Sequence, residues 1–379
     1  MAAAAPATPS SALLVVPQRI GDVLLATPII ASLKRKWPAL SIDVLVFKGT
    51  EGVLSGNPQI REVLAIDHRL PARDHLRLFS RIWRRYDISV STMCGDRPTL
   101  YAWAASKFSV GPILAASRNQ GWKRVLLARH LPFDDLGTHT VAMGLKIAAL
   151  VGVDPYPEVQ VNWLTEDEQV ALRIVRETLQ DAPFTVLHPT PKFNYKKWYS
   201  NGWRELADWL ANQGLKIVLT GSANPEEGDY LDKIFPRLPP SIINVAGKLN
   251  FGALAALLKR ASLYVGPDTV VTHMAAALGV PTVALFGPSN PVKWGPWPRG
   301  CNAYPSPYRF RGTQFVGNVA LVQGAGHCVP CLQEGCARHE GSESVCLQML
   351  AAGTVIEAAE NLLARTRVLS DSVIERLSD

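Results

Sequence analysis

The sequence predicts an α/β protein made of two doubly wound domains, each a mostly parallel sheet with helices on both faces. First, the chain has 379 residues, which is long for one hydrophobic core and comfortable for two. Second, short apolar runs alternate with helical patterns, as is typical of parallel strands joined by crossover helices. Third, this alternation repeats after a break near residues 152–165, where Gly152, Pro155 and Pro157 interrupt the pattern.

The expected elements follow the chain in this order. In the first half, apolar runs predict strands at 13–16, 42–47, 63–66 and 88–90, and a helix at 23–36 that ends before a proline. In the second half, the strands are expected at 184–187, 215–219, 242–245, 263–265 and 282–286, and the helices at 166–179, 203–212, 251–260 and 269–278. Residues 165–168 fit a capping box, and Gly279 fits a helix stop. Residues 287–350 are expected to be irregular, and a last helix is expected at about 355–377.

Composition excludes several classes of protein. Hydrophobic residues make up 47% and charged residues 19%, which excludes a disordered chain, and six cysteines are too few for a disulfide scaffold. The net charge of +7 favours anionic partners. The sequence has no apolar run of about 18 residues that would span a membrane. Residues 1–11 are expected to be a disordered lead-in rather than a secretory signal, so we expect a cytoplasmic protein.

The first candidate site is the loop at residues 20–22, after the first strand. Gly21 permits a tight turn, and Asp22 stands where a helix begins. Asp22 is therefore either an N-cap carboxylate or a general base near an acceptor hydroxyl. The loop matches neither a dinucleotide fingerprint nor a Walker loop.

The second candidate site is the strand–turn–helix unit at residues 266–273. Asp268 or Thr269 can cap the helix, whose free N–H groups form an anion site. Thr269 and His273 are four residues apart and share one helix face. The alternative is a capped core helix with a satisfied buried histidine.

Two further strand ends carry polar side chains. The strand at 184–187 precedes Thr190 and three lysines that suit a diphosphate: Lys192, Lys196 and Lys197. Residues 220–222, with Glu226 and Glu227 behind them, end the next strand, where a carboxylate suits ribose hydroxyls. Solvated surface loops are the alternative at both places.

These segments together resemble glycosyltransferase family 9, the bacterial heptosyltransferases. Four stretches carry the resemblance, at residues 20–28, 188–198, 219–222 and 266–288, in the order of the family and within residues 12–290. The resemblance implies a GT-B fold, in which two Rossmann-like domains face an interdomain cleft. It implies an acceptor-binding domain at 12–160, a donor-binding domain at 161–350 with a cysteine-rich loop at 300–350, and a final helix at 351–379 that packs back toward the first domain.

The activity implied is transfer of heptose from ADP-heptose to the inner core of lipopolysaccharide, on lipid A–Kdo or an extended core. The transfer proceeds with inversion and requires no catalytic metal or other cofactor. The residues implied are Asp22 as base and Lys196 at the diphosphate, with Thr190, Lys192, Gly221, Glu226, Asp268, Thr269, Val270 and His273 at the donor. Arg19 and Arg97 are expected at the acceptor.

One departure from the family is Val270, which follows Asp268 and Thr269 where the family usually has glycine. Its side chain could crowd the phosphates or alter the choice of donor. A GT-B transferase or epimerase with another nucleotide sugar therefore stays open. A two-domain protein that binds an anionic ligand without chemistry is the alternative from a different class.

Two clusters outside these motifs complete the prediction. Arginines recur at positions 73, 77, 81 and 85, with Arg84 beside them. They form either the solvated side of an amphipathic helix or a surface that docks at the cytoplasmic face of the inner membrane. Nucleic acid is not an expected partner, because no binding motif accompanies the charge. The second cluster, Cys328, Cys331, Cys336 and Cys346, suits structural zinc, reduced thiols in an irregular loop, or disulfides.

Overall fold

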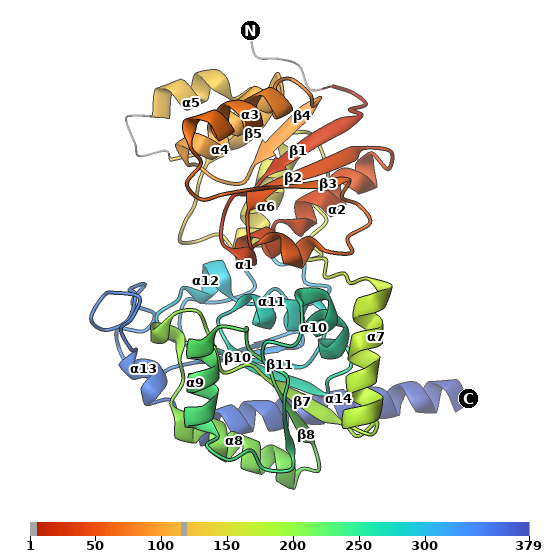
Figure 1. Ribbon diagram of the computed structural model, residues 1–379, viewed down its shortest axis with the longest axis vertical. Coiled ribbons are helices and arrows are strands. Elements are labelled where there is room, and N and C mark those ends of the chain that lie inside the picture. Colours follow the sequence, from red (N-terminus) through yellow and green to blue (C-terminus); the bar gives the residue numbers. More distant parts are fainter. Residues whose placement is uncertain (1–5, 115–119, 379) are drawn as a thin grey trace. The chain divides into compact units, whose positions relative to one another are not determined.

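The computed structural model describes residues 6–114 and 120–378, with side chains as far as Arg365. The chain divides into two compact units. The first comprises the chain up to Asn162 together with Asn302–Ser306. The second comprises Trp163–Cys301 and the chain from Pro307 onward. Each unit has its own sheet and its own core, so each is described by itself (Figure 1).

The first unit is built on a six-stranded parallel sheet in the order β3-β2-β1-β4-β5-β6. Its strands are β1 (Ser11–Val15), β2 (Ser41–Phe47), β3 (Glu62–Ile66), β4 (Ile88–Ser91), β5 (Phe108–Ile113) and β6 (Arg129–Pro132). The strand order reverses between β1 and β4, which pair directly. Ligands of doubly wound sheets bind at the carboxyl ends of the strands at such a reversal.

Helices connect these strands. They are α1 (Ile20–Leu25), α2 (Thr27–Lys36), η1 (Glu51–Leu54), α3 (Ala72–Ile82), α4 (Asp96–Ala105), α5 (Gly121–Leu126) and α6 (Thr140–Ala149). The helix α3 packs against α4, and α2 packs against α6 (Figure 1). The apolar sides of β1, β2 and β3 are buried under α3 and α4 in one cluster, which includes Leu13, Leu45 and Ile82.

The second unit repeats the arrangement with seven strands in the order β12-β13-β11-β10-β7-β8-β9. Its strands are β7 (Phe184–Leu187), β8 (Lys216–Leu219), β9 (Ile242–Asn244), β10 (Leu263–Pro267), β11 (Thr282–Phe286), β12 (Gln314–Val316) and β13 (Val319–Gln323). All neighbours are parallel except β12, which lies antiparallel to β13. The order reverses between β7 and β10, so this unit has the same topology as the first, with one added edge strand.

The helices of the second unit cover this sheet. They are α7 (Thr165–Arg173), the π turn η3 (Ile174–Thr178), η4 (Asn194–Lys196), α8 (Ser200–Asn212), α9 (Pro225–Ile234), α10 (Phe251–Leu258), α11 (Val270–Ala277), α12 (Pro291–Trp294), α13 (Val345–Gln348) and α14 (Ala352–Ser378). The last of them, α14, packs against α8, β11 and β13 within this unit. That the closing helix also packs toward the first unit stays a prediction.

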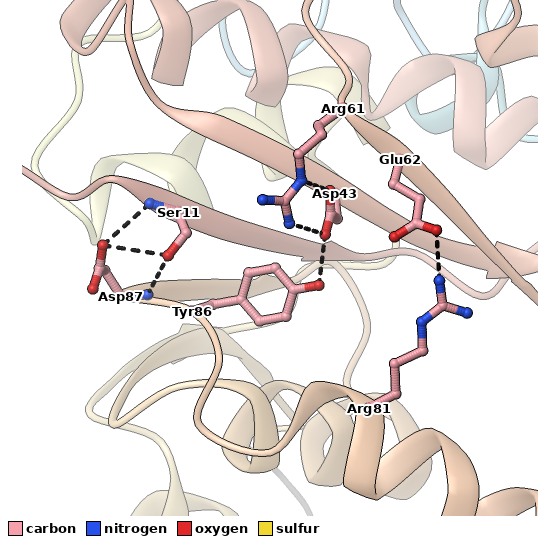
Figure 2. A network of polar contacts seen from close by, with 7 residues as sticks. All are labelled: Ser11, Asp43, Arg61, Glu62, Arg81, Tyr86 and Asp87. Atoms are coloured by element: carbon pink, nitrogen blue, oxygen red, sulfur yellow. Dashed lines mark hydrogen bonds and ion pairs between the residues drawn. The ribbon is translucent and has the colours of Figure 1, made fainter.

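Buried polar contacts tie the amino-terminal ends of the first sheet together (Figure 2). The carboxylate of Asp43 is only 1% exposed, and it accepts hydrogen bonds from the Arg61 guanidinium (Nε to Oδ1, 2.9 Å) and the Tyr86 hydroxyl (2.7 Å). Nearby, Arg81 on α3 forms an ion pair with Glu62 on β3. These contacts lie at the end of the strands opposite to the candidate site, so they support the sheet rather than the chemistry.

The structure corrects four local predictions. The helix expected at 23–36 is two helices that meet at Ala26, before Pro28. The capping box expected at residues 165–168 lies one residue earlier. Leu164 is the N-cap residue of α7, and the N–H of Leu164 donates to the carboxylate of Asp167 (3.0 Å). Residues 287–350 are not wholly irregular, since β13 is a buried parallel strand beside β11. Of the expected disordered lead-in, residues 1–5 lie outside the described residues, but Ser10 bonds to Asp87 (2.7 Å).

The run of basic residues also differs from the expected helix face. The helix α3 ends at Ile82, so Arg84 and Arg85 lie outside it. Arg84 has a positive φ of 50° and donates to the carbonyl of Trp103 (2.7 Å). With Arg81 bound to Glu62, the arginines of this run that stand out from α3 are Arg73 and Arg77, whose side chains are 85% and 82% exposed.

Candidate functional site

In the second unit, the loops after β7, β8 and β10 gather at one edge of the sheet. The strand β10 pairs with β7, and β7 pairs with β8, all in parallel, so their carboxyl ends are adjacent. The N–H of His188 bonds to the carbonyl of Val265 (3.0 Å), and the N–H of Thr220 bonds to that of Leu187 (3.0 Å). The three sequence motifs at 188–198, 219–222 and 266–273 therefore lie together, at the reversal of strand order.

A buried ion pair joins two of these loops. The Lys196 ammonium lies 2.6 Å from Oδ2 of Asp268, and the two side chains are only 17% and 9% exposed. Burial raises the pKa of Asp268, but the charge of Lys196 and its hydrogen bond outweigh burial and lower that pKa below its ordinary value. Asp268 is therefore ionised at neutral pH, and the pair presents a cation beside the first turn of α11.

Two buried polar atoms in the segments that follow β7 and β10 have no hydrogen-bond partner within the part of the chain that the structure describes. One is Oγ1 of Thr190, a residue 3% exposed, and the other is Nδ1 of His273, which is 5% exposed. Burial lowers the pKa of His273 to about 4, so its ring is neutral at neutral pH. Buried polar groups are normally paired, and leaving one unpaired costs about 1–3 kcal/mol. Both atoms therefore point to a polar ligand.

The start of α11 lacks a capping side chain among the described residues. Thr269 is its N-cap residue in extended conformation, and neither Thr269 nor Asp268 caps the helix with a side-chain hydrogen bond. Thr269 thus occupies one of the two predicted N-cap positions, without a capping hydrogen bond from its side chain. Val270 is the first helical residue and is partly buried. The first N–H groups of a helix carry partial positive charge, which favours an anion at this position.

The other two lysines of the loop point elsewhere. Lys192 is exposed, and its ammonium lies 5.6 Å from the ring centre of Phe193. The ammonium of Lys197 lies over the ring of Tyr230, at 4.3 Å, and burial lowers its pKa. Among the three candidates, Lys196 is thus the one placed beside Asp268.

The loop after β8 brings in a carboxylate. Glu227 accepts a hydrogen bond from the N–H of Ser222 (2.7 Å), whereas Glu226 is exposed in the first turn of α9. A side chain at Gly221 would place its Cβ 3.0 Å from Oγ1 of Thr190, so glycine avoids a close contact with that buried hydroxyl. Both predicted acids lie in the first turn of α9, and Glu227 is the one whose side chain turns back to the strand-end loop.

In the first unit, the loops after β1 and β4 are neighbours. The N–H of Thr92 bonds to the carbonyl of Val15 (3.1 Å), where both strands end. Arg19 and Asp22 follow β1, and Arg97 follows β4 and donates to the carbonyl of His68 (3.0 Å). The two arginines predicted at the acceptor therefore follow adjacent strands, Arg19 as the N-cap residue of α1 and Arg97 in the first turn of α4.

Asp22 is not an N-cap residue. The N-cap of α1 is Arg19, and Asp22 is the third helical residue. The side chain of Asp22 is half-buried. This placement contradicts the capping alternative and leaves a carboxylate at the carboxyl edge of the sheet, where ligands bind.

The cysteine-rich loop shows free thiols. Cys336 accepts a hydrogen bond from the N–H of Val345 (Sγ to N, 3.4 Å). Burial raises the pKa of Cys346 to about 11, and the neighbouring Cys331 makes a smaller contribution in the same direction. Over the described ranges, no three His, Cys, Asp or Glu side chains converge as a metal site requires. The arrangement is that of reduced thiols in an irregular loop, and structural zinc stays a prediction.

Among the described helices, none is both long enough and apolar enough to cross a bilayer.

Two Rossmann-like units in one chain are the architecture of the GT-B class, to which the solved structures of similar chains belong. The predicted fold class is thereby confirmed. The sequence profile of glycosyltransferase family 9 (heptosyltransferase) matches residues 113–309, just over half of the chain. The chain belongs to this family.

Similar proteins agree with this assignment. Lipopolysaccharide heptosyltransferase 3 of Escherichia coli (strain K12) is 27% identical over 287 residues, which cover 73% of this chain and 82% of the relative. Lipopolysaccharide heptosyltransferase 1 of Pseudomonas aeruginosa is 26% identical over 337 residues, 86% of each chain. The solved structure of Escherichia coli ADP-heptose lps heptosyltransferase II superposes with a TM-score of 0.69 at 21% identity and covers 94% of this chain and 99% of that one.

Proposed function

We propose that this protein transfers heptose from ADP-heptose to the inner core of lipopolysaccharide, with inversion at the anomeric carbon. The names of the similar proteins support the substrate class. The observation that carries the proposal is that two buried atoms, Thr190 Oγ1 and His273 Nδ1, lack a partner among the described residues, in the strand-end segments that also carry the ion pair of Lys196 and Asp268. A nucleoside diphosphate sugar supplies both the anionic groups and the hydroxyls that these atoms lack.

The donor site accounts for departure of ADP. As the glycosidic bond to the diphosphate breaks, negative charge develops on the leaving oxygen. Lys196 and the first N–H groups of α11 would stabilise this charge, and fixed donors of this kind act most strongly where water is excluded. The carboxylate of Glu227 supplies an acceptor for the ribose hydroxyls. These groups need no metal ion for the step, so we expect the rate to survive treatment with EDTA.

The acceptor side requires a base and positive charge. Asp22 takes the proton of the acceptor hydroxyl while that oxygen attacks the anomeric carbon from the side opposite to ADP, which inverts the configuration. Arg19 and Arg97 begin the helices that follow the paired strands β1 and β4, and they suit the anionic groups of the inner core, either lipid A–Kdo or an extended core. Comparison of the anomeric configuration of donor and product by NMR tests inversion.

Calorimetric titration of the purified protein with ADP, UDP and GDP tests the donor. We expect ADP to bind at least tenfold more tightly than the other two, a difference of about 1.4 kcal/mol. Preference for UDP or GDP would keep the glycosyltransferase assignment and overturn ADP-heptose. Because Val270 stands at the start of α11, the same titrations of a Val270→Gly variant show whether this side chain sets the choice of nucleotide.

We also propose that the first unit contacts the cytoplasmic face of the inner membrane through α3, because the acceptor is anchored in lipid. The exposed arginines Arg73 and Arg77 flank Leu76, which is 72% exposed. The carboxylate of Asp74 lies 3.8 Å from the guanidinium of Arg73 and 3.5 Å from that of Arg77. Because one negative charge faces two positive charges, this part of α3 keeps a net positive charge. Arginines beside an apolar side chain suit an anionic lipid surface.

Replacing Arg73 and Arg77 with glutamine is expected to weaken binding to vesicles that contain anionic phospholipid by about 30-fold, at about 1 kcal/mol for each charge. Sedimentation of protein with such vesicles measures the effect. The matched control replaces Arg173 and Arg176, two exposed arginines of the second unit. Equal loss in both variants would show a general effect of net charge and contradict a role for α3.

A further inference from the structure

Gln18 lies beside the carboxylate of Asp22. The strand β1 ends at Val15, and the N–H of Gln18 bonds back to the carbonyl of Val16 (2.8 Å), which forms a tight turn. With its NH2 group turned toward Asp22, the side-chain nitrogen of Gln18 lies 3.0 Å from Oδ1 and 3.2 Å from Oδ2. The opposite orientation would set the amide oxygen against two carboxylate oxygens, so the donor orientation is the one that hydrogen bonding selects.

The backbone holds both residues in place. The N–H groups of Asp22 and Val23 bond to the carbonyl of Arg19, at 3.0 Å and 3.2 Å, so α1 starts directly after the turn that carries Gln18. Gln18 itself is partly buried, which limits the water that could replace its amide. The side-chain nitrogen of Gln18 thus lies within hydrogen-bond distance of both carboxylate oxygens of Asp22, and backbone hydrogen bonds fix the short segment that carries the two residues.

We propose that Gln18 is a positioning residue that orients the Asp22 carboxylate toward the acceptor hydroxyl. The inference rests on the proposed role of Asp22 as the base. A neutral amide suits this task, because it fixes the plane of the carboxylate and adds no positive charge of its own. A lysine or arginine here would form an ion pair and make the carboxylate a weaker base. A hydrogen bond to a charged group of this kind is lost when the amide is replaced by an apolar side chain.

The test compares Gln18→Leu and Gln18→Glu with the wild-type enzyme in the heptosyl-transfer reaction. In Gln18→Leu we expect kcat to fall about tenfold, as the loss of one hydrogen bond to a charged group predicts, while KM for the donor stays unchanged. In Gln18→Glu, which keeps the shape of the side chain, a second negative charge holds the proton on Asp22 to higher pH. The acid limb of the pH–rate profile should therefore move upward. The control is Gln169→Leu, at an exposed glutamine of α7.

Two outcomes separate this inference from the proposed function. If both Gln18 variants keep the wild-type kcat and acid limb while Asp22→Asn is inactive, the positioning role is overturned and the base remains. If Asp22→Asn keeps its turnover, the base assignment fails first, and the inference fails with it. Should Gln18→Leu unfold, as its thermal melting would show, the isosteric Gln18→Glu variant decides alone by its pH–rate profile.

Discussion

Replacing Asp22 with asparagine is expected to lower kcat for heptosyl transfer by about 10²–10⁴-fold and to leave the affinity for ADP unchanged. Asparagine has nearly the same shape as aspartate but cannot accept the proton of the attacking hydroxyl, and general bases contribute rate factors of this size. The nucleotide is expected on the second unit, whereas Asp22 belongs to the first, so binding and turnover should separate. Steady-state kinetics and titration with ADP measure the two effects.

The matched control for this change is Asp154→Asn, at an exposed acid of the same unit. It should keep the wild-type rate, because no proposed step uses this carboxylate. A rate for Asp22→Asn within a few-fold of wild type would show that another group takes the proton.

Replacing Lys196 with methionine is expected both to weaken ADP binding and to destabilise the second unit. The change removes the cation of a pair whose side chains are 17% and 9% exposed, and it leaves the Asp268 carboxylate buried without its partner. Breaking a buried pair in this way costs about 3–5 kcal/mol. Urea unfolding measures the loss, and titration with ADP measures the change in affinity, which we expect to be about 10–100-fold from the loss of a charge-assisted contact.

The pH dependence of this loss has a definite sign. The pKa of Asp268 is lowered in the folded protein, so the ion pair contributes stability above the ordinary carboxyl range and loses it as the pH falls through the lowered pKa. The difference in unfolding free energy between wild type and Lys196→Met should therefore be full at pH 7 and shrink in acid. Lys192→Met is the control, because its exposed ammonium lies against Phe193. An effect of Lys192→Met on ADP binding that equals that of Lys196→Met would contradict the assignment to Lys196.

Much of the fold could be predicted because buried parallel strands are continuous apolar runs. The strands β7 and β11 begin and end where the sequence indicates, since each is fully buried. The edge strand β6 could not be found in this way, because its four residues are exposed or only partly buried and carry no apolar pattern. The strand β13 was hidden for another reason: it is buried and apolar, but it lies in a segment whose prolines, glycines and cysteines suggest irregular structure.

The sequence could predict which loops form the candidate site but not which side chain of each loop turns into it. The order of strands implies that the loops carrying Lys196 and Asp268 meet, and they do. The sequence could not distinguish Lys196 from Lys192, because both lie in one irregular loop and only tertiary contacts decide which one turns inward. The choice between Glu226 and Glu227 depended on which side chain turns back to the N–H of Ser222. The residue that sequence analysis missed is Gln18, whose amide has no motif to mark it.

The short segment Asn302–Ser306 gives the first unit a dependence on the late part of the chain. It belongs to that unit although about 140 residues of the other unit precede it in the sequence, and its Pro305 carbonyl accepts the N–H of His139 (3.0 Å), while Lys146 lies 4.9 Å from the ring centre of Tyr304. When a ribosome has synthesised only residues 1–162, the nascent first unit therefore still lacks the segment Asn302–Ser306. Vectorial synthesis should leave this unit incomplete until Ser306 has left the exit tunnel, and a single proteolytic cut after Asn162 should not yield two self-sufficient fragments.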